Sequence, residues 1–438
     1  MPENKQTRHL LAQIATRPVF RAAVLFANFF LIITALYHLK PASRSLILES
    51  HTTIDLPYIW IGSAALILLG MPFYQKLLRR YKRQTVVAMT LTAFTALLVI
   101  FWMLLRDPGD FTTIAFYLLV DIIGVTLVEQ AWSLTNSLFE TDEAKSWYGL
   151  VGTGGLLGGV AGSAISGAVI RFTSLQTPDL LLITAFILIL LLALNIWMHF
   201  QGIYDHDSHH KSVVPFKHGL RALLHNRYLI LIAGGLLIAQ LVSPLVEYQF
   251  MGVVEQTYTE REARTAALSL FFTVLSGFSI GVNLLLTPLI LKFGGVLSGL
   301  LVQPLLMSVS VIIFSQVPGY LTASAMKISD RGLSYSLTRA SRELLYIPIP
   351  SEVIFESKAW IDMFGYRLFK VFGAGLILLV ASGQSVHASA TQLNLAILLA
   401  CLGWIGLLMF LYRQYRSIQL RGLRRGPGPS AAKRALQQ

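Results

Sequence analysis

The sequence is poor in cysteine and in charged residues. Its 438 residues include one cysteine, Cys401, so no intrachain disulfide can form and catalysis by a thiol is not expected. Charged residues make up 13% of the chain, and no nucleophile–base or metal-ligand spacing stands out among them. The segment YDHDSHHK, residues 204–211, has metal-ligand residue types, but nothing orients its imidazoles and a solvated loop explains it better. We therefore expect a protein that is not an enzyme and has no metal and no cofactor.

Hydrophobic residues, by contrast, make up 55% of the chain, and the mean hydropathy is +0.63. A soluble domain of this length does not need so much apolar surface, so the composition indicates an integral, multi-pass membrane protein. Runs of about 20 apolar residues are long enough to cross the roughly 30 Å hydrocarbon core as helices. We expect an all-α protein with twelve transmembrane helices, at residues 19–39, 56–76, 84–105, 111–139, 148–171, 179–200, 227–250, 268–291, 295–314, 319–346, 364–383 and 391–412.

Basic residues predict the orientation. There are 35 Lys and Arg against 22 Asp and Glu, and the basic ones gather before the first run, between the second and third, in the central loop and after residue 412. By the positive-inside rule both termini face the cytoplasm, as expected in a bacterial inner membrane. Because the positive charge is dispersed over loops on one face, nucleic-acid binding is a poor alternative. The first run has no small-residue cleavage site before or after it, so we expect a helix and not a signal peptide.

One segment of the sequence is nearly repeated. EAKSWYGLVG, residues 143–152, returns as ESKAWIDMFG, residues 356–365, at a spacing of 213 residues. This spacing equals six helices plus a polar linker, which predicts two homologous six-helix halves in the same topology. Parallel repeats of this kind are typical of the major facilitator fold, with the substrate site between the halves. The predicted boundaries are 1–200 for the N-terminal bundle, 201–226 for a cytoplasmic linker, 227–412 for the C-terminal bundle and 413–438 for a basic cytoplasmic tail.

The fifth run begins with the glycine-rich segment GLVGTGGLLGGVAGSAISG, residues 149–167. A nucleotide-binding glycine loop needs a preceding strand and a soluble two-layer domain, and neither is predicted. Small residues four apart instead allow membrane helices to approach each other closely. We therefore expect this segment to be a helix-packing face.

Polar and ionisable side chains inside the apolar runs are the candidate functional residues, because a charge in a membrane is costly unless it faces a cavity or a partner. On the tenth run, Lys327 and Arg331 lie four residues apart on one face, where Asp330 can neutralise one of them. The predicted substrate-binding residues are Asn28, Lys40, Arg44, Asp121, Lys327, Arg331 and Tyr335. The predicted gating or coupling residues are Glu129, Glu247, Asp330, Arg339, Arg342 and Glu343 in the runs, and Glu143, Lys145, Glu356, Lys358 and Asp362 in the repeated segments.

These charges also have a purely structural interpretation. They can form interhelical ion pairs, for example Asp121 with Arg331, that hold one state closed. The functional interpretation is a site for a small anionic solute with surplus basic groups, yet the surplus is one charge, too small to identify a polyanion. This surplus of one positive charge is the difference between two sets of residues. The basic residues are those at 40, 44, 327, 331, 339 and 342, and the acidic residues are those at 121, 129, 247, 330 and 343.

Residues 335–376, YSLTRASRELLYIPIPSEVIFESKAWIDMFGYRLFKVFGAGL, resemble the nucleotide transporter family of ATP/ADP translocases of plastids and intracellular bacteria. The shared pattern is Tyr-Ser-Leu, a basic-Glu pair before Tyr-Ile-Pro, Lys-Ala-x-Ile-Asp, and Lys before a glycine-rich helix. EYQFMG, residues 247–252, and EAKSWYGLVG also look similar to family segments. The resemblance covers the whole chain at low density and about fifty residues densely.

The resemblance implies a twelve-helix antiporter that exchanges cytosolic and external nucleotides, with a functional lysine ending the first helix, here Lys40. The sequence departs from the family pattern in three places. Pro41 replaces the acidic residue after that lysine, Thr338-Arg339-Ala340 replace Phe-Asp-Pro, and residues 369–372, FKVF, replace Gly-Lys-Ser-Gly. A relative with another anionic or amphipathic cargo therefore stays open.

Two functions follow from these observations. The first is a monomeric secondary carrier that exchanges nucleotides or related phosphorylated metabolites by alternating access, with Lys327, Arg331 and Lys40 pairing the phosphates. The second is a proton-coupled major-facilitator transporter of a non-nucleotide solute such as a siderophore, drug or lipid-like anion, with Asp121, Glu129 or Asp330 as the proton site. A scaffold or sensor with the same fold has less support, since no appended soluble domain is predicted.

Overall fold

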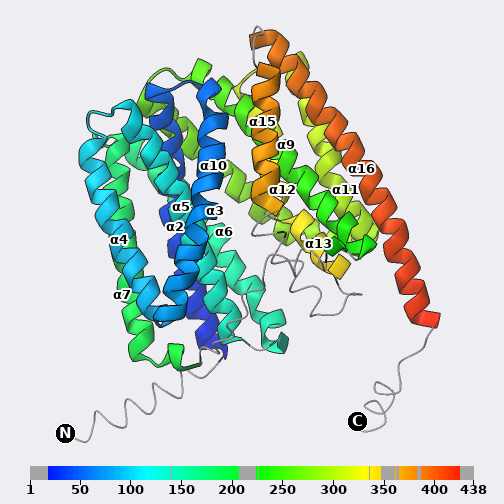
Figure 1. Cartoon of the computed structure of the whole chain (residues 1–438), viewed down its shortest axis with the longest axis horizontal. Helices are drawn as coiled ribbons and strands as arrows, with labels where there is room; N and C mark the ends of the chain where they lie inside the picture. Colours follow the sequence, from blue (N-terminus) through cyan, green and yellow to red (C-terminus); the bar gives the residue numbers. More distant parts are fainter. Residues whose placement is uncertain are drawn as a thin grey trace, which may run out of the picture. The chain divides into compact units, whose positions relative to one another are not determined.

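The computed structural model describes residues 18–139, 141–206, 223–224, 226–334, 336–346, 361, 365–381 and 386–424. Every regular element in these ranges is helical, which confirms the predicted all-α class (Figure 1). The helices are α2 (Pro18–Ser50), α3 (Leu56–Arg80), α4 (Arg83–Leu104), α5 (Asp110–Leu138), α6 (Thr141–Phe172), α7 (Leu180–Phe200), α9 (Arg227–Thr257), α10 (Arg261–Gly281), α11 (Thr287–Gln316), α12 (Tyr320–Ser334), α13 (Leu337–Tyr346), α15 (Tyr366–Ala381) and α16 (Val386–Arg424).

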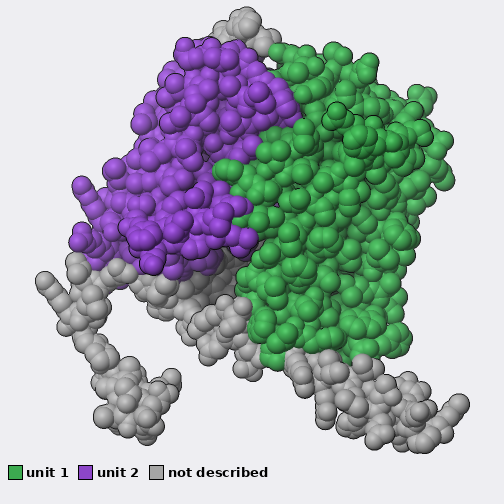
Figure 2. Space-filling model, turned by 180° about the vertical axis from the view of Figure 1, so that it is seen from behind, with its two compact units in different colours: residues 1–212, 251–280 green, residues 213–250, 281–438 purple. Residues whose placement is uncertain are grey.

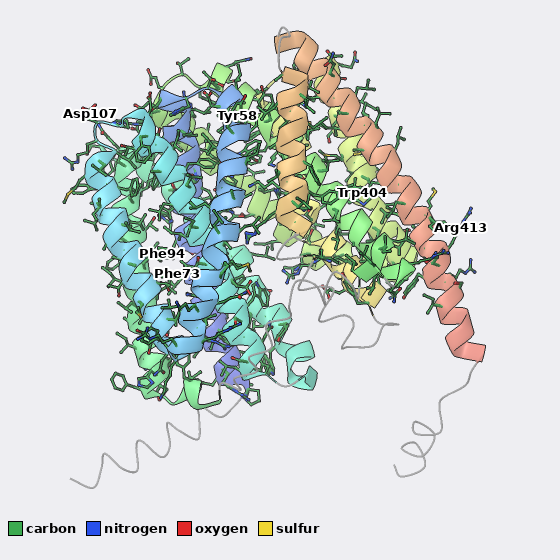
Figure 3. The ribbon with its side chains drawn as sticks, in the orientation of Figure 1. Tyr58, Phe73, Phe94, Asp107, Trp404 and Arg413 are labelled. Atoms are coloured by element: carbon green, nitrogen blue, oxygen red, sulfur yellow. The ribbon has the colours of Figure 1, made fainter. Side chains whose placement is uncertain are left out.

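Nine stretches of the described ranges are long and apolar enough to cross a membrane. They are 18–50, 53–80, 83–104, 110–138, 147–172, 177–200, 227–257, 261–316 and 390–418. Their outer faces carry large apolar side chains; Phe73 of α3, for example, is 73% exposed, whereas Phe94 of α4 is buried (Figure 3). Such a surface suits lipid and not water. The chain is therefore a multi-pass membrane protein, and the count of twelve helices stays a prediction.

Helix boundaries differ from the expected ones where charged residues lie inside a helix. α2 does not end near residue 39 but continues to Ser50, through Pro41, and its last turns bury Leu46, Ile47 and Leu48. The expected helix over 319–346 is wrong, because α12 ends at Ser334 and α13 begins at Leu337. There the hydroxyl of Ser334 donates to the carbonyl of Asp330 at 2.7 Å and that of Ser336 to Gly332 at 2.8 Å. Back-bonding serines of this kind weaken and bend helices.

The chain forms two compact units (Figure 2). Unit 1 comprises residues 1–212 and 251–280, and unit 2 comprises residues 213–250 and 281–438, so the boundary falls inside α9 and again at the end of α10. In unit 2 the core is built by α9, α13 and α16, where Tyr228, Leu345 and Trp404 are buried together. The Tyr228 hydroxyl donates to the Leu345 carbonyl at 2.8 Å, which ties the start of α9 to the end of α13.

In unit 1 two helices begin with the same device. Short 3₁₀ turns, Thr53–Asp55 and Thr177–Asp179, precede α3 and α7. In each turn an aspartate accepts a hydrogen bond from the backbone N–H three residues earlier, Thr52 to Asp55 at 3.0 Å and Gln176 to Asp179 at 2.8 Å. These capping boxes satisfy amide groups that would otherwise lack partners at a helix start.

The glycine-rich face of α6 packs on α2, as the spacing of small residues predicted. A Cβ added to Gly154, Gly158 or Gly162 would lie 2.6, 2.4 or 2.5 Å from the carbonyl oxygens of Phe26, Phe30 and Thr34. These glycines occur four residues apart, so one face of α6 lies directly against the α2 backbone. Only glycine permits that approach, which holds α2, the helix with Lys40 and Arg44, in place.

The close approach predicts a position-specific effect of alanine in α6. Gly158→Ala should lower the free energy of unfolding by about 2 kcal/mol, because the new methyl group meets backbone atoms that cannot move aside. Gly152→Ala is the matched control, since nothing lies within 4 Å of its added Cβ. Thermal unfolding of both variants in detergent checks the prediction, and equal melting temperatures would contradict the packing described.

Candidate functional site

The predicted charges of the tenth run form a buried cluster in unit 2. The Nζ of Lys327 lies 3.1 Å from Asp330 Oδ2, and the Nε of Arg331 lies 3.4 Å from the same oxygen. Lys327 and Asp330 are each 4% exposed at the side chain, whereas Arg331 is 25% exposed. The prediction that Asp330 neutralises a neighbouring cation is confirmed, and one carboxylate oxygen serves both cations.

Helix α9 supplies the other half of the cluster. Glu247 Oε2 lies 2.8 Å from the Nζ of Lys327, and the hydroxyl of Ser243 donates to Asp330 Oδ2 at 2.7 Å. Ser243 and Glu247 are four residues apart on α9, so they share one face toward α12. Lys327 therefore sits between two carboxylates from two helices, 80 residues apart in sequence.

A third helix supports the cluster from behind. Gln303 of α11 donates through Nε2 to the carbonyl of Asp330 at 2.9 Å and to the hydroxyl of Ser334 at 2.7 Å. Its Oε1 accepts a hydrogen bond from Thr338 of α13 at 2.8 Å. Gln303 itself is 2% exposed. The amide thus fixes the α12 backbone at the residue that holds the two cations, and it connects the cluster to α13.

The cluster combines two cations with two carboxylates, so its formal charge is zero. Removing a single ion from water costs several kcal/mol even after relaxation, and paired geometry with added hydrogen bonds offsets much of that cost. Charged side chains in membrane helices are therefore found with partners or facing a water-filled path. Ammonium and guanidinium groups such as those of Lys327 and Arg331 can donate hydrogen bonds to phosphate oxygens as well as to carboxylate oxygens.

In unit 1 two predicted cations lie against aromatic rings. The Nζ of Lys40 is 4.3 Å from the ring centre of Tyr37, and the guanidinium of Arg44 is 5.5 Å from that of Phe272 on α10. Tyr37 and Phe272 themselves meet edge to face, 5.7 Å apart. Lys40 was expected to end the first helix, which is wrong: α2 continues for about 15 Å beyond it to Ser50. Pro41 lies inside this helix, where a membrane helix tolerates it.

The remaining predicted residues of unit 1 lie on α2 and α5. Asn28 is buried in α2. Asp121 accepts a hydrogen bond from the hydroxyl of Ser63 on α3 at 2.6 Å. Glu129 lies two turns further along α5 and is exposed. Pairing of Asp121 with Arg331 would link unit 1 to unit 2 and stays a prediction.

The predicted gating residues of α13 lie apart from the cluster. Arg339 and Arg342 line a separate pocket of unit 2. The side chain of Glu343 is 47% exposed, and its Oε1 lies 4.0 Å from the Nη2 of Arg342. The described residues do not include Tyr335, Glu356, Lys358 and Asp362, nor the side chains of Glu143 and Lys145, so their roles stay predictions.

A polar network that the sequence did not predict lies at the end of unit 1 where α9 meets α10. The backbone N–H of Thr53 donates to Glu255 Oε2 at 2.9 Å, and that of Thr177 donates to Glu262 Oε2 at 2.9 Å. The hydroxyls of both threonines donate to the same glutamates. Each capped 3₁₀ turn thus receives one glutamate from the α9–α10 hairpin.

Two arginines complete this network. Arg264, 4% exposed, donates to the backbone carbonyls of Ser45, Tyr258 and Thr259 at 3.0 to 3.1 Å. Arg261 lies 3.3 Å from Glu49 and 2.9 Å from Glu262. We call Glu255, Arg261, Glu262 and Arg264 the hairpin latch. The signal in the sequence was the pair of similar segments TTID and QTPD facing the charge-dense TEREAR, residues 259–264.

The cluster geometry predicts unequal effects of neutralising its two carboxylates. Asp330→Asn should lower the free energy of unfolding by about 3 kcal/mol, because Lys327, Arg331 and Ser243 all contact its Oδ2. Glu247→Gln should cost less, since Lys327 keeps Asp330. Asp107→Asn, in an exposed loop (Figure 3), is the control with no expected change. Chemical or thermal unfolding in detergent measures all three, and an equal loss for the two cluster variants would contradict the central place of Asp330.

Comparisons with known proteins agree with a transporter. The family model described as TLC ATP/ADP transporter matches residues 102–329 and 321–415. ADP,ATP carrier protein 4 of Rickettsia conorii is 22% identical over 349 residues, which cover 69% of this chain and 68% of that protein. ADP,ATP carrier protein 2 of Chlamydia pneumoniae is 26% identical over 220 residues, 44% of this chain and 40% of that one.

A solved structure shares the fold. The crystal structure of the nucleoside transporter NupG is similar with a TM-score of 0.54 at 11% identity, and the similarity covers 92% of this chain and 99% of that one. At this identity the likeness concerns the fold alone. The family model, by contrast, matches well over half of the sequence and includes the helices that carry the buried cluster. The chain belongs to the TLC ATP/ADP transporter family.

Proposed function

We propose that this protein exchanges nucleotides of the ATP/ADP type across a membrane as a secondary transporter. Membership of the TLC ATP/ADP transporter family and the names of its relatives support a nucleotide cargo. The observation that carries the proposal is Lys327, buried between Glu247 and Asp330 with Arg331 beside it. The proton-coupled alternative is not favoured by these relatives.

The proposed mechanism is competition between carboxylates and phosphates for the same donors. With no nucleotide bound, Glu247 and Asp330 neutralise Lys327 and Arg331. Phosphate oxygens then replace the carboxylate oxygens, which rotate away. In either case the cations keep anionic partners, whereas a state with neither is opposed by the cost of unpaired buried charge. The exchange of ADP for ATP is proposed from the family description and from the names of the relatives. Lys40 and Arg44 of unit 1, with Asn28 and Asp121, are proposed as further substrate contacts.

The proposal includes an alternating-access cycle between two six-helix halves, 1–200 and 227–412, in a monomer with both termini in the cytoplasm of a bacterium. The hairpin latch then lies at the end of α2 opposite the N-terminus, on the outer side of the membrane. Its glutamates hold α10 to the turns that start α3 and α7. We propose that this latch closes the outer side and must part during each cycle.

Transport by purified protein in liposomes tests the nucleotide proposal. Proteoliposomes loaded with ADP should take up labelled ATP, whereas empty proteoliposomes should not. The double variant Glu247→Gln with Lys327→Gln keeps the cluster neutral and should fold, yet its exchange should fall at least about tenfold because a phosphate donor is lost. Lys292→Gln, an exposed cation of the same unit, is the control. No uptake of any nucleotide by folded wild-type protein would reject the proposed function.

Weakening the hairpin latch should change the rate of the cycle and not the affinity for nucleotide. Glu255→Gln with Glu262→Gln should lower or raise the maximal exchange rate several-fold with little change in KM, since neither residue is a proposed nucleotide contact. The exposed Glu260→Gln is the matched control.

A cysteine reporter separates opening from misfolding. Ser166 on α6 is buried against Ser269 of α10, with 3.4 Å between their hydroxyls. In a Cys401→Ser background, Ser166→Cys should react with a maleimide faster when the two latch glutamates are replaced. Unchanged labelling in the latch variant would show that the hairpin does not hold α10 closed.

A further inference from the structure

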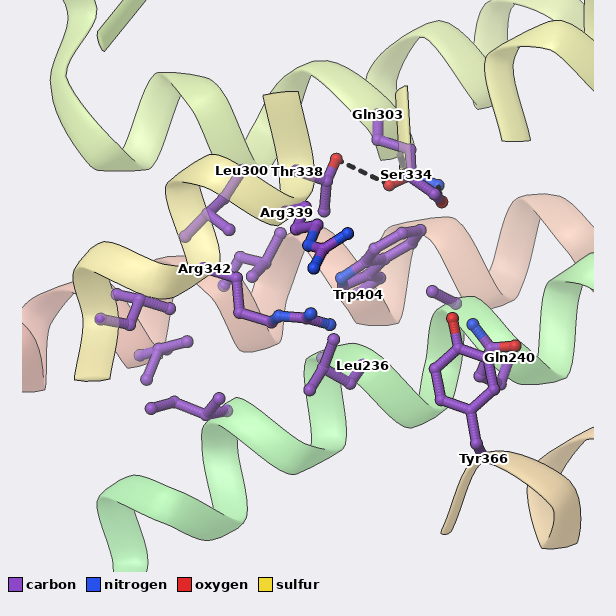
Figure 4. A pocket seen from close by; sticks show the side chains of 16 residues that line it. Leu236, Gln240, Leu300, Gln303, Ser334, Thr338, Arg339, Arg342, Tyr366 and Trp404 are labelled. Atoms are coloured by element: carbon purple, nitrogen blue, oxygen red, sulfur yellow. Dashed lines mark hydrogen bonds between the residues drawn. The ribbon is translucent and has the colours of Figure 1, made fainter. Parts of the chain in front are cut away.

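Unit 2 contains a pocket that is separate from the charged cluster. It lies between α9, α11, α13 and α16 and extends to the start of α15, with about 540 Å³ of empty space that is partly open to solvent (Figure 4). None of Glu247, Lys327, Asp330 and Arg331 is among its described lining residues. Gln303 and Ser334 belong to its lining and also hydrogen-bond at the cluster, so the two places adjoin.

One wall of this pocket is cationic. Arg339 and Arg342 occur three residues apart on α13, so their side chains leave the same face of the helix. Figure 4 shows both guanidinium groups extending into the pocket. No aspartate or glutamate is among the lining residues that the structure describes. The Nε of Arg342 is buried and has no hydrogen-bond partner within the described ranges, so the wall holds a donor suited to an anion.

The opposite part of the pocket is aromatic and apolar. Trp404 of α16 is 3% exposed and lies beside Arg339 in Figure 4, and Tyr366 lies beside Gln240. On α9 the small residues Gly235 and Ala239 face this side of the pocket, and a Cβ added to Gly235 would lie 3.6 Å from the indole nitrogen of Trp404. Indole and phenol rings are the side chains on which planar heterocycles stack, and a neighbouring amide can donate to and accept from the edge of a base.

Resting on the proposed nucleotide function, we infer that this pocket is a second nucleotide subsite. Arg339 and Arg342 bind the phosphate groups, and Trp404 and Tyr366 stack on the base, with Gln240 at its edge. A nucleoside phosphate has both parts that the lining requires, an anionic end and a flat ring, whereas free phosphate leaves the aromatic half unused. The nucleotide is held here next to the Lys327 cluster, and Gln303 connects the two places.

Photolabelling locates the bound nucleotide directly. Wild-type protein in liposomes is irradiated with 8-azido-ATP and the modified peptides are mapped by mass spectrometry. The expected label falls on the peptides that contain Trp404 or Tyr366, and unlabelled ADP should protect them. Exchange-active protein that is labelled only elsewhere would overturn the inference and leave the proposed function in place.

Charge removal tests the phosphate half of the subsite. Arg342→Gln and Arg339→Gln should each raise the KM for ATP and ADP about tenfold, and pyrophosphate should lose its inhibition of exchange in them. Inhibition by adenosine, which has no phosphate, should change less than twofold. Arg413→Gln, an exposed arginine on the outside of α16 (Figure 3), is the matched control.

The outcomes separate the two claims. Arg342→Gln and Arg339→Gln must both elute as folded protein. Trp404→Phe, which keeps an aromatic ring, should still be labelled by 8-azido-ATP. Unchanged KM and pyrophosphate inhibition in folded arginine variants would overturn the subsite alone. Wild-type protein that neither exchanges nucleotides nor is labelled would overturn the proposed function, and the subsite with it.

Discussion

Lys327 can remain charged inside a bundle of membrane helices because Glu247 and Asp330 reach it from two sides. A lone ammonium group at that position would cost several kcal/mol, and loss of one partner from a buried pair typically costs 3–5 kcal/mol. The pairing therefore imposes a relation among three helices: α9 must present Ser243 and Glu247 to α12, and α11 must place Gln303 behind Asp330.

Unit 1 is held together in a different way. Its central contact, α6 on α2, depends on glycines whose absent side chains let the helix lie against backbone carbonyls. Its strongest polar contacts lie at one end, where glutamates of the α9–α10 hairpin bind the capped turns of Thr53 and Thr177. Lys40 and Arg44 lie against the aromatic rings of Tyr37 and Phe272 within this frame, in cation–π contacts that add to its packing.

Local patterns predicted much of this arrangement. The apolar runs located most helices, the glycine spacing located the α6 packing face, and the spacing of Lys327, Asp330 and Arg331 located half of the buried cluster. The sequence did not predict contacts between distant segments. No pattern near Lys327 indicates that Glu247 pairs with it, and no pattern near Arg342 indicates that Trp404 lines the same pocket. The predicted helix ends were wrong where a helix continues through charged residues, as at Lys40, Arg44 and Arg261. A prediction from apolar runs ends the helix at the first charged residue, although contacts with distant residues allow that residue to lie inside the helix.

The central claim is that nucleotide phosphates bind the cations that Glu247 and Asp330 hold. The most direct measurement is the thermal stability of purified protein as a function of ADP concentration. At a hundredfold excess over its dissociation constant, ADP should stabilise the wild type by roughly 2.7 kcal/mol. The same concentration should stabilise the folded double variant Glu247→Gln with Lys327→Gln by less, because only the second subsite then binds the nucleotide. An equal stabilisation of both proteins would contradict the claim, because the nucleotide would then bind without Lys327.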